Sequence, residues 1–321
     1  MRLIRGTTPG GAPTQGSVAT IGTFDGVHRG HQALLERLVS EARDRDLAAA
    51  VVTFEPHPRE YFAGRRGVLP PARLTSLREK LVCFRKAGVD LIWLLRFDST
   101  LAAREAEHFA RVILVDGLQA RAVLVGDDFR FGRQRAGDVG LLTRLGGEQG
   151  FTVSTMDTVE DGGERIGSSK VRDALAAGDF GRAKRLLGRP WTVTARVTHG
   201  DQLGRRLGFP TANMPLKRRV FPVSGVVAVR VHGLGGSPRE GVANIGTRPT
   251  VGGKRPLLEV HLFDYEEKLY GRRLEVEFCW KLREEEHFED LDALTRAMEE
   301  DAIRARAWFA DHKTRQENKT A

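Results

Sequence analysis

The chain has 321 residues, of which 40% are hydrophobic and 29% charged, a length that suits two domains and a composition that excludes a disordered protein. No apolar run is long enough for a membrane span, no signal-peptide pattern opens the chain, and the two cysteines, Cys83 and Cys279, favour a cytoplasmic protein without a disulfide framework or zinc site. The net charge of +9 comes from basic residues scattered among acidic ones, so it does not indicate nucleic-acid binding.

The first 186 residues alternate strand-like apolar runs with helix-like patterns, and we expect them to form one domain. The expected strands are residues 17–23, 48–54, 89–95, 121–126 and 151–155, and the expected helices are residues 31–46, 75–87, 102–116 and 138–149. This alternation predicts a doubly wound α/β domain with a parallel sheet. Ligands of such domains bind beyond the carboxyl ends of the strands.

Residues 22–31, GTFDGVHRGH, place His28 and His31 at the expected turn from the first strand into a helix. Free N–H groups and the positive end of the helix dipole can hold a phosphate at such a turn, and the imidazoles can donate to its oxygens. A bare pair of histidines at this spacing also fits a surface pair, a chance metal pair or a helix cap. Gly22 and Gly30 favour a nucleotide site, because glycine lets the backbone approach a ligand closely.

Three further distinctive segments follow later strands and are expected to meet in the same crevice. They are residues 53–58 (TFEPHP), 126–132 (GDDFRFG) and 167–172 (GSSKVR). In the last segment Ser168 and Ser169 begin an expected helix and Arg172 adds charge, so this segment can hold the rest of a triphosphate. A plain serine N-cap beside exposed basic residues is the alternative interpretation.

These four segments together resemble the adenylyltransferase half of the bacterial bifunctional riboflavin kinase/FAD synthetases. The resemblance implies transfer of AMP from ATP to FMN, with His28 and His31 stabilising charge on the α-phosphate. The implied ATP-binding residues are Gly22, Phe24, Gly30, Ser168, Ser169 and Arg172, and the implied flavin-side residues are Phe54, Pro56, His57 and Asp128. The family usually has a hydroxyl residue where this chain has Gly167, and His57 fits a packed structural residue between two prolines equally well.

From residue 187 the pattern becomes that of an antiparallel sheet, so residues 187–321 are expected to form a second domain. The expected strands are residues 192–198, 226–231, 257–263 and 274–278, and an amphipathic helix is expected over residues 284–311. Glycine-rich turns separate these strands. The pattern predicts an antiparallel β-barrel, or a sandwich, with a C-terminal helix.

The segment 199–213, HGDQLGRRLGFPTAN, is the first candidate site of this domain. Its glycines, Gly200, Gly204 and Gly208, could let the backbone wrap a phosphate, although a tight barrel turn explains the same spacing. Thr211 and Asn213 place two neutral oxygens on one side of an extended segment, which suits a hard cation when phosphates supply further oxygens.

In residues 257–263, LLEVHLF, the alternation places Glu259 and His261 on the same face of a strand. A carboxylate on a half-buried face is costly unless it is used or paired, so Glu259 is a candidate general base. A rim glutamate paired with one of the many arginines is the alternative, and His261 is expected to be structural.

The segments GRRLGFPTAN, GVANIGTRPT and LEVHLFDYEEKLYGRRLEVEF are similar to the riboflavin kinase module of the same family. The resemblance implies that Thr211 and Asn213 hold Mg²⁺-ATP and that Glu259 takes the proton of the riboflavin 5′-hydroxyl. Asn244 and Arg248 lie in a loop motif that is implied to line the flavin site. The family often has an aromatic residue where this chain has Val227.

We therefore expect an enzyme that converts riboflavin to FMN and FMN to FAD, each time with ATP, and whose partners are small molecules, not nucleic acid or a membrane. One alternative is another His-x-Gly-His nucleotidyltransferase, acting on a pantetheine or nicotinamide phosphate, but it would need no kinase-like second half. The other is a flavin- or RNA-binding regulator, which would not need His28, His31 and Glu259 together. Nothing in the sequence bears on self-association.

Overall fold

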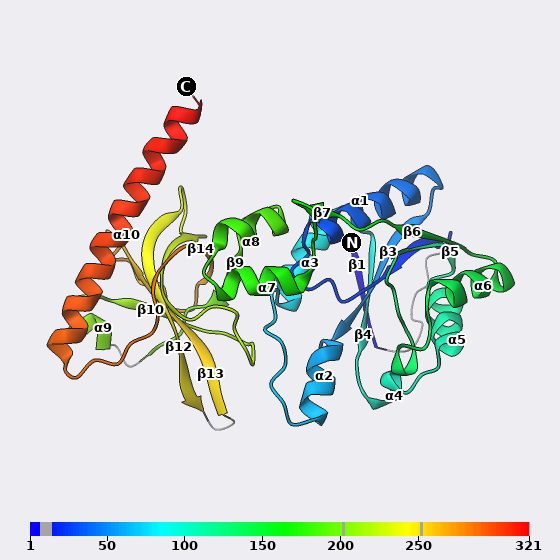
Figure 1. Ribbon diagram of the computed structural model, residues 1–321, viewed down its shortest axis with the longest axis horizontal. Coiled ribbons are helices and arrows are strands. Elements are labelled where there is room, and N and C mark those ends of the chain that lie inside the picture. The colour runs from blue at the N-terminus through cyan, green and yellow to red at the C-terminus, as the bar shows by residue number, and fades with distance from the viewer. Residues whose placement is uncertain (7–14, 201–202, 251–252, 321) are drawn as a thin grey trace. The chain divides into compact units, whose positions relative to one another are not determined.

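The chain divides into two compact units in a computed structural model that describes residues 1–6, 15–200, 203–250 and 253–320 (Figure 1). The first unit comprises Met1–Pro71 and Leu77–Ser168, and the second comprises Ala72–Ser76 and Ser169–Ala321. Each unit has its own sheet of six strands.

The sheet of the first unit is parallel throughout, with the strand order β1-β4-β3-β2-β5-β6. Its strands are β1 (Arg2–Arg5), β2 (Ser17–Ile21), β3 (Ala48–Glu55), β4 (Leu91–Arg96), β5 (Ala120–Gly126) and β6 (Thr152–Met156). The five expected strands are confirmed, and with them the parallel α/β fold. The sequence missed β1, because only Ile4 of its four residues is buried and no apolar run marks it.

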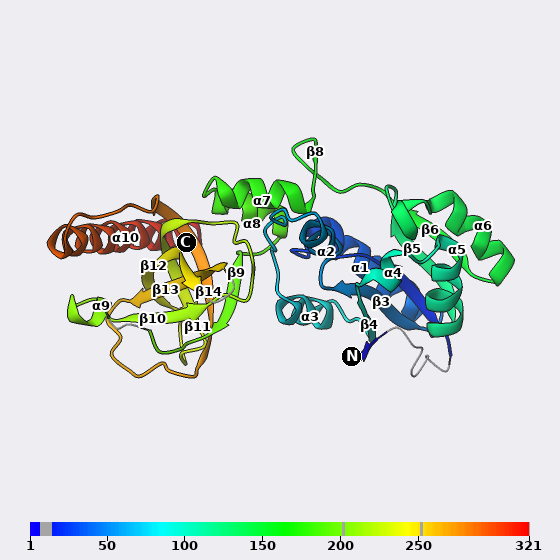
Figure 2. The ribbon, with the colours of Figure 1, turned by 90° about the horizontal axis from the view of Figure 1, so that it is seen from below.

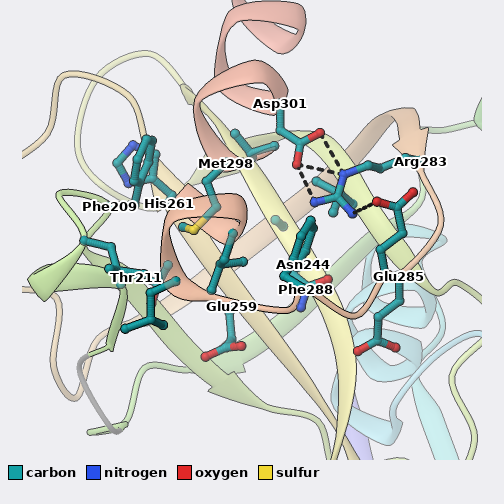
Figure 3. Close-up of a pocket in the computed structure, with 18 of the residues that line it drawn as sticks. Phe209, Thr211, Asn244, Glu259, His261, Arg283, Glu285, Phe288, Met298 and Asp301 are labelled. Carbon is teal, nitrogen blue, oxygen red and sulfur yellow. Dashed lines mark hydrogen bonds and ion pairs between the residues drawn. The ribbon is translucent and has the colours of Figure 1, made fainter. Parts of the chain in front are cut away.

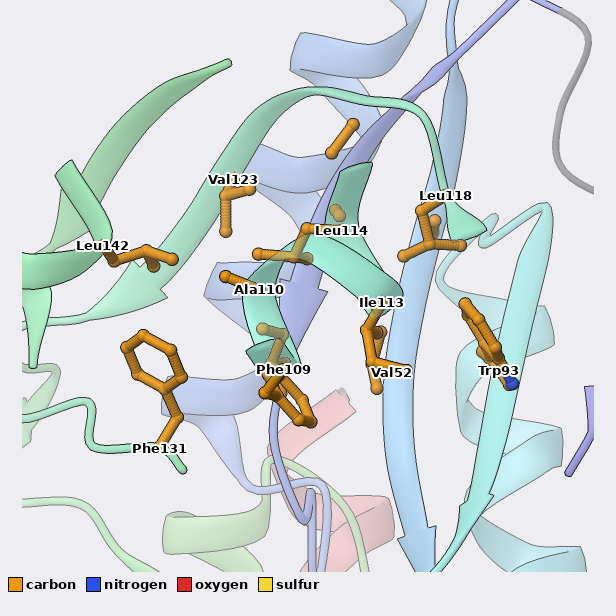
Figure 4. Packing of buried hydrophobic residues seen from close by; sticks show 14 of the residues in the cluster. Val52, Trp93, Phe109, Ala110, Ile113, Leu114, Leu118, Val123, Phe131 and Leu142 are labelled. Carbon is orange, nitrogen blue, oxygen red and sulfur yellow. The ribbon is translucent and has the colours of Figure 1, made fainter. Parts of the chain in front are cut away.

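Helices cover both faces of this sheet, as a doubly wound fold requires. One face packs against α1 (Arg29–Asp44) and α3 (Leu77–Lys86), and the other against α5 (Ala106–Phe109), a π-helix (Ala110–Gly117) and α6 (Val139–Gln149) (Figure 4). Successive β3 residues therefore face opposite cores, Val51 toward α1 and Val52 toward the π-helix. Because both faces of the sheet are buried, the sequences of its strands are continuous apolar runs.

The helix expected over residues 102–116 is broken into three pieces, of which α4 (Ser99–Ala102) is the first. At the end of the π-helix, a Cβ on Gly117 would lie 2.1 Å from a ring carbon of Trp93, so only glycine permits this packing. The unit also contains α2 (Pro58–Arg65), a 3₁₀ turn (Arg133–Arg135) and a hairpin of β7 (Glu160–Asp161) and β8 (Glu164–Arg165).

The second unit is built on an antiparallel sheet with the order β10-β13-β12-β11-β14-β9. Its strands are β9 (Thr192–Arg196), β10 (Thr211–Pro215), β11 (Gly225–His232), β12 (Arg239–Thr250), β13 (Gly253–Leu262) and β14 (Arg273–Arg283), with a short helix α9 (Leu203–Arg206) before β10. The Thr198 N–H donates to the Asn213 carbonyl, with N···O 2.8 Å, and so links the chain after β9 to β10. The sheet thus nearly closes, which confirms the expected barrel.

Two helices, α7 (Ser168–Ala176) and α8 (Phe180–Leu187), precede the barrel, and α8 packs on β14 with the rings of Phe180 and Phe278 5.9 Å apart. The segment Ala72–Ser76 also belongs to this unit, because the Leu74 carbonyl accepts from Trp191 Nε1 (3.1 Å) and Arg218 Nη1 (3.3 Å). The functional domain boundary expected at residues 186/187 stays a prediction.

The long helix α10 (Leu291–Thr320) lies against β11, β12 and β14 (Figure 2). Its buried residues Ala305 and Phe309 pack on the barrel. The helix was expected to begin at residue 284, but it begins after Asp290, whose Oδ1 accepts the N–H of Ala293 (2.7 Å). Within the described ranges, no helix combines the length and the apolarity that crossing a membrane requires.

Candidate functional site

The barrel unit contains a pocket of about 840 Å³ between its sheet and the beginning of α10 (Figure 3). Strands β10, β12 and β13 form one wall, and residues 284–290 with the first turns of α10 form the other. The pocket brings together five predicted site residues, namely Gly204, Thr211, Asn213, Asn244 and Glu259.

The strand register explains why these residues meet. Glu259 on β13 lies opposite Asn213 on β10 and opposite Asn244 on β12. Side chains of directly opposed residues share a face, with Cβ atoms about 5 Å apart. Thr211 is likewise opposed to His261, so the predicted common face of Glu259 and His261 is confirmed. The half-buried Glu259 carboxylate is therefore flanked by two amides.

Asn213 has the features of a cation ligand. Its side chain is only 6% exposed, and its Oδ1 is buried without a hydrogen-bond partner. A buried acceptor left unsatisfied costs about 1–3 kcal/mol, so such an oxygen commonly serves a ligand. Among the described residues no group of three or more His, Cys, Asp or Glu could hold a metal ion. The neutral oxygens of Thr211 and Asn213 fit Mg²⁺ when phosphate oxygens complete its shell.

Close packing explains why glycines occupy the loop before β10. A Cβ on Gly200 would lie 2.4 Å from the Asn213 Oδ1, and one on Gly204 would lie 2.3 Å from the Phe209 carbonyl oxygen. Gly208 has a φ of +84°, which favours glycine. Gly204 also lines the pocket. Phosphate binding by these glycines stays a prediction, and the side chain of Arg248 lies outside the described part of the structure.

The opposite wall of the pocket is held by an ion pair that the sequence analysis missed. Arg283 Nη2 lies 2.9 Å from Asp301 Oδ2, and Arg283 Nε lies 3.1 Å from both carboxylate oxygens. The guanidinium also stacks over the Phe288 ring, 5.4 Å from its centroid (Figure 3). Arg283 thereby connects the end of β14, the 284–290 segment and α10, and no local motif marks such a connection.

His261, on the same wall as Glu259, carries a neutral ring. Burial lowers the pKa of His261, and its Nδ1 lies 3.1 Å from the Pro210 carbonyl oxygen, to which it donates. This contact fits the expected structural role.

In the first unit, His28 and His31 stand at the start of α1. His28 is the N-cap, and its Nδ1 accepts the N–H of His31 at 3.4 Å. The two rings stack with centroids 3.7 Å apart and planes 18° apart. Because Nδ1 of His28 is an acceptor, the proton of its neutral ring resides on Nε2.

His31 is a buried neutral imidazole. Burial holds the pKa of His31 well below its usual value, and the nearby His28 and Lys80 lower that pKa further. Its Nδ1 is buried without a hydrogen-bond partner, and its ring lies 5.0 Å from the Phe24 ring. At neutral pH the ring therefore brings no permanent positive charge to the turn.

The loop around the histidines is tightly packed. A Cβ on Gly22 would lie 2.9 Å from the Phe24 ring, and one on Gly30 would lie 3.3 Å from His28 Nδ1. Ser168 Oγ donates to the Asp25 carbonyl at 2.9 Å, so the structure brings the start of α7 to the histidine turn.

In the segment 167–172, the residues from Ser169 onward belong to the second unit. Ser169 is exposed, and Arg172 Nε donates to the Ala72 carbonyl at 2.5 Å. Their joint action with the histidines on one nucleotide stays a prediction.

His57 caps α2. Its Nδ1 accepts the N–H of Arg59 at 3.0 Å, and Glu60 completes a capping box by accepting the His57 N–H. This contact supports the structural interpretation of His57. Flavin binding by His57 and by the adjacent Pro56 stays a prediction.

The other residues expected on the flavin side lie at the carboxyl ends of strands. Phe54, at the end of β3, packs edge-to-face on Phe97 with centroids 5.8 Å apart. Asp128 follows β5, and its largely exposed carboxylate pairs with Arg165 at 2.8 Å. Flavin binding by both stays a prediction.

Comparison with known proteins assigns a family to each part of the chain. The FAD synthetase family model matches residues 12–170, and the riboflavin kinase family model matches residues 187–309. The bifunctional riboflavin kinase/FMN adenylyltransferase of Escherichia coli K12 is 50% identical to this chain, and that of Haemophilus influenzae is 44% identical. Each match covers 96% of this chain and at least 98% of the relative. The solved structure of a macrolide-efflux protein from Streptococcus pneumoniae has a TM-score of 0.76 and 27% identity, covering 93% of this chain and 97% of its own.

Proposed function

Because this chain belongs to the family of bifunctional riboflavin kinase/FMN adenylyltransferases, we propose that its two sites divide the two reactions between them. The enzyme phosphorylates riboflavin with ATP to give FMN, and it transfers AMP from a second ATP to FMN to give FAD and pyrophosphate. The barrel pocket is the kinase site, and the His28–His31 turn is the adenylyltransferase site. The observation that carries this assignment is the meeting of Thr211, Asn213 and Glu259 in one pocket.

In the kinase site, Glu259 acts as the general base. The riboflavin 5′-oxygen attacks the γ-phosphorus of ATP and ADP leaves, while the Glu259 carboxylate accepts the hydroxyl proton. Asn213 and Thr211 are the residues that would hold Mg²⁺, since both offer neutral oxygens and Asn213 Oδ1 has no protein partner. When bound, the ion offsets the negative charge of the phosphates.

In the adenylyltransferase site, the chain supplies positioning and charge stabilisation. A phosphate oxygen of FMN attacks the α-phosphorus of ATP in line, and the bond to pyrophosphate breaks. The attacking oxygen is already anionic, so no general base is required. His28, through its Nε2–H, and His31 donate to the α-phosphate, while Ser168, Ser169 and Arg172 hold the remaining phosphates.

We also propose that the enzyme works in the cytoplasm and binds neither nucleic acid nor membranes. Both cysteines are free and partly buried, which suits a reducing compartment. The basic residues form many pairs with acidic ones, such as Arg43 with Asp90 at 2.8 Å, so the positive charge is locally compensated.

One assay tests the two-step function. The purified protein is incubated with riboflavin, ATP and Mg²⁺, and the flavins are resolved chromatographically over time. FMN should appear first and FAD afterwards. A folded protein that forms neither product would contradict the proposal.

A further inference from the structure

A buried lysine lies beside the histidine turn. Lys80 on α3 is only 4% exposed, although lysine is almost never buried unless it is used. Its Nζ donates to the Thr23 carbonyl at 2.5 Å, and the same carbonyl accepts from Thr53 Oγ1 at 3.4 Å. Thr23 lies in the loop that connects β2 to His28.

The conformation of this loop requires contacts from other elements. Phe24 and Val27 have φ angles of 50° and 43°, which residues other than glycine seldom adopt. The Thr23 carbonyl belongs to the peptide that leads into Phe24, so the Lys80 and Thr53 donors fix its orientation. The Phe24 ring in turn packs against His31. A chain of contacts therefore runs from Lys80 through the loop to the histidine.

Lys80 is also the positively charged side chain close to His31, whose pKa it lowers. Besides burial, the proximity of His28, in the same turn, and of Lys80, on α3, lowers the pKa of His31, while Asp25 lies buried in the same loop. The attack of one phosphate on another brings several negative charges together at this turn. A fixed cation stabilises them without reorganising during the reaction.

We propose that Lys80 is a positioning residue for AMP transfer: its hydrogen bond to Thr23 fixes the loop against which His31 packs, and its charge acts on the histidine turn. The inference rests on the proposed role of His28 and His31 in that step.

The test compares Lys80→Met, Lys80→Gln and Lys80→Arg with a control, Lys86→Met, which removes an exposed lysine of the same helix. FAD formation from FMN and ATP is measured across pH, and FMN formation from riboflavin by the same samples is the internal control. For Lys80→Met we expect kcat for FAD formation to fall about 10- to 100-fold, with KM for ATP changed less than about threefold. FMN formation and the Lys86→Met control should match the wild type.

The pH profile separates positioning from simple packing. Removal of the Lys80 charge raises the pKa of His31, so the change in kcat that accompanies protonation of His31 should move to higher pH in Lys80→Met and Lys80→Gln but not in Lys80→Arg. The inference is overturned if Lys80→Met keeps the wild-type kcat and profile. If Lys80→Met does not fold, the profile of Lys80→Gln decides in the same way. Unchanged FAD formation in His31→Ala would instead refute the proposed role of the histidine turn.

Discussion

At His31, burial has a consequence for stability as well as for catalysis. The pKa of His31 is well below its usual value in the folded protein, whereas the unfolded chain binds a proton near pH 6.5. Protonation therefore favours unfolding, and the stability connected with this group is present above about pH 6.5 and is lost as the pH falls toward the folded-state pKa.

We accordingly expect the wild type to lose stability below about pH 6.5 more steeply than His31→Ala does. Denaturant unfolding of both proteins at a series of pH values measures the difference. Equal pH dependence in the two proteins would show that His31 is not buried in its neutral form.

Glu259 offers a second test at the scale of one residue. Glu259→Gln keeps the size of the side chain but cannot accept the proton of the riboflavin hydroxyl, so FMN formation should fall about 10²- to 10⁴-fold. FAD formation from supplied FMN should match the wild type, because the glutamate belongs to the other site. FMN formation close to the wild-type rate would exclude Glu259 as the base.

Single residues also differ in whether the sequence alone can identify them as site residues. His28, His31, Thr211 and Asn213 stand in compact motifs, and strand alternation is enough to single out Glu259. Lys80 was missed because its contact, Thr23, is 57 residues away. Long-range contacts of this kind depend on packing between elements and leave no local pattern.

At the scale of elements, the Arg283–Asp301 pair holds α10 and the 284–290 segment at the barrel pocket that we propose as the kinase site. Asp301→Ala removes the buried carboxylate partner of Arg283 and leaves only the exposed Glu286, 3.6 Å away, which should destabilise the protein by about 3 kcal/mol. The KM of the riboflavin kinase reaction should rise, because the wall of the pocket loses the ion pair that holds it in place.

A matched control exists on the same helix. Arg306 pairs with Asp264 at 2.8 Å, but both side chains are largely exposed. Asp264→Asn removes the charge and suits the φ of 52° at this position, so it should leave thermal unfolding and kinase KM unchanged. If the two substitutions had equal effects, the Arg283–Asp301 pair would have no special role in the pocket.

Helices and strands could be predicted where burial is periodic. The predicted start of a helix was wrong where a single polar contact fixes it. Residues 284–290 share the amphipathic pattern of α10, yet the Asp290 cap starts the helix later. Strand β12 was missed because its sequence, REGVANIGTRPT, contains glycine, asparagine and proline in place of an alternating apolar run.

At the scale of the whole molecule, the strand–helix alternation and the change to antiparallel patterning predicted both folds. The assignment of Ala72–Ser76 to the second unit was not predictable, because it depends on donors from Trp191 and Arg218, more than 100 residues later. One chain thus carries two compact units built on unrelated sheets, one parallel and one antiparallel.

If the two steps are separate, two defective variants should complement each other. His31→Ala should convert riboflavin to FMN and stop, and Glu259→Gln should make little FMN from riboflavin but should still adenylylate FMN. The decisive measurement is chromatographic detection of FAD from riboflavin, ATP and Mg²⁺ with each variant alone and with an equal mixture. We predict FAD in the mixture and almost none with either variant alone. Wild-type FAD formation by either variant alone, or none in the mixture, would contradict the division of the reactions between the two sites.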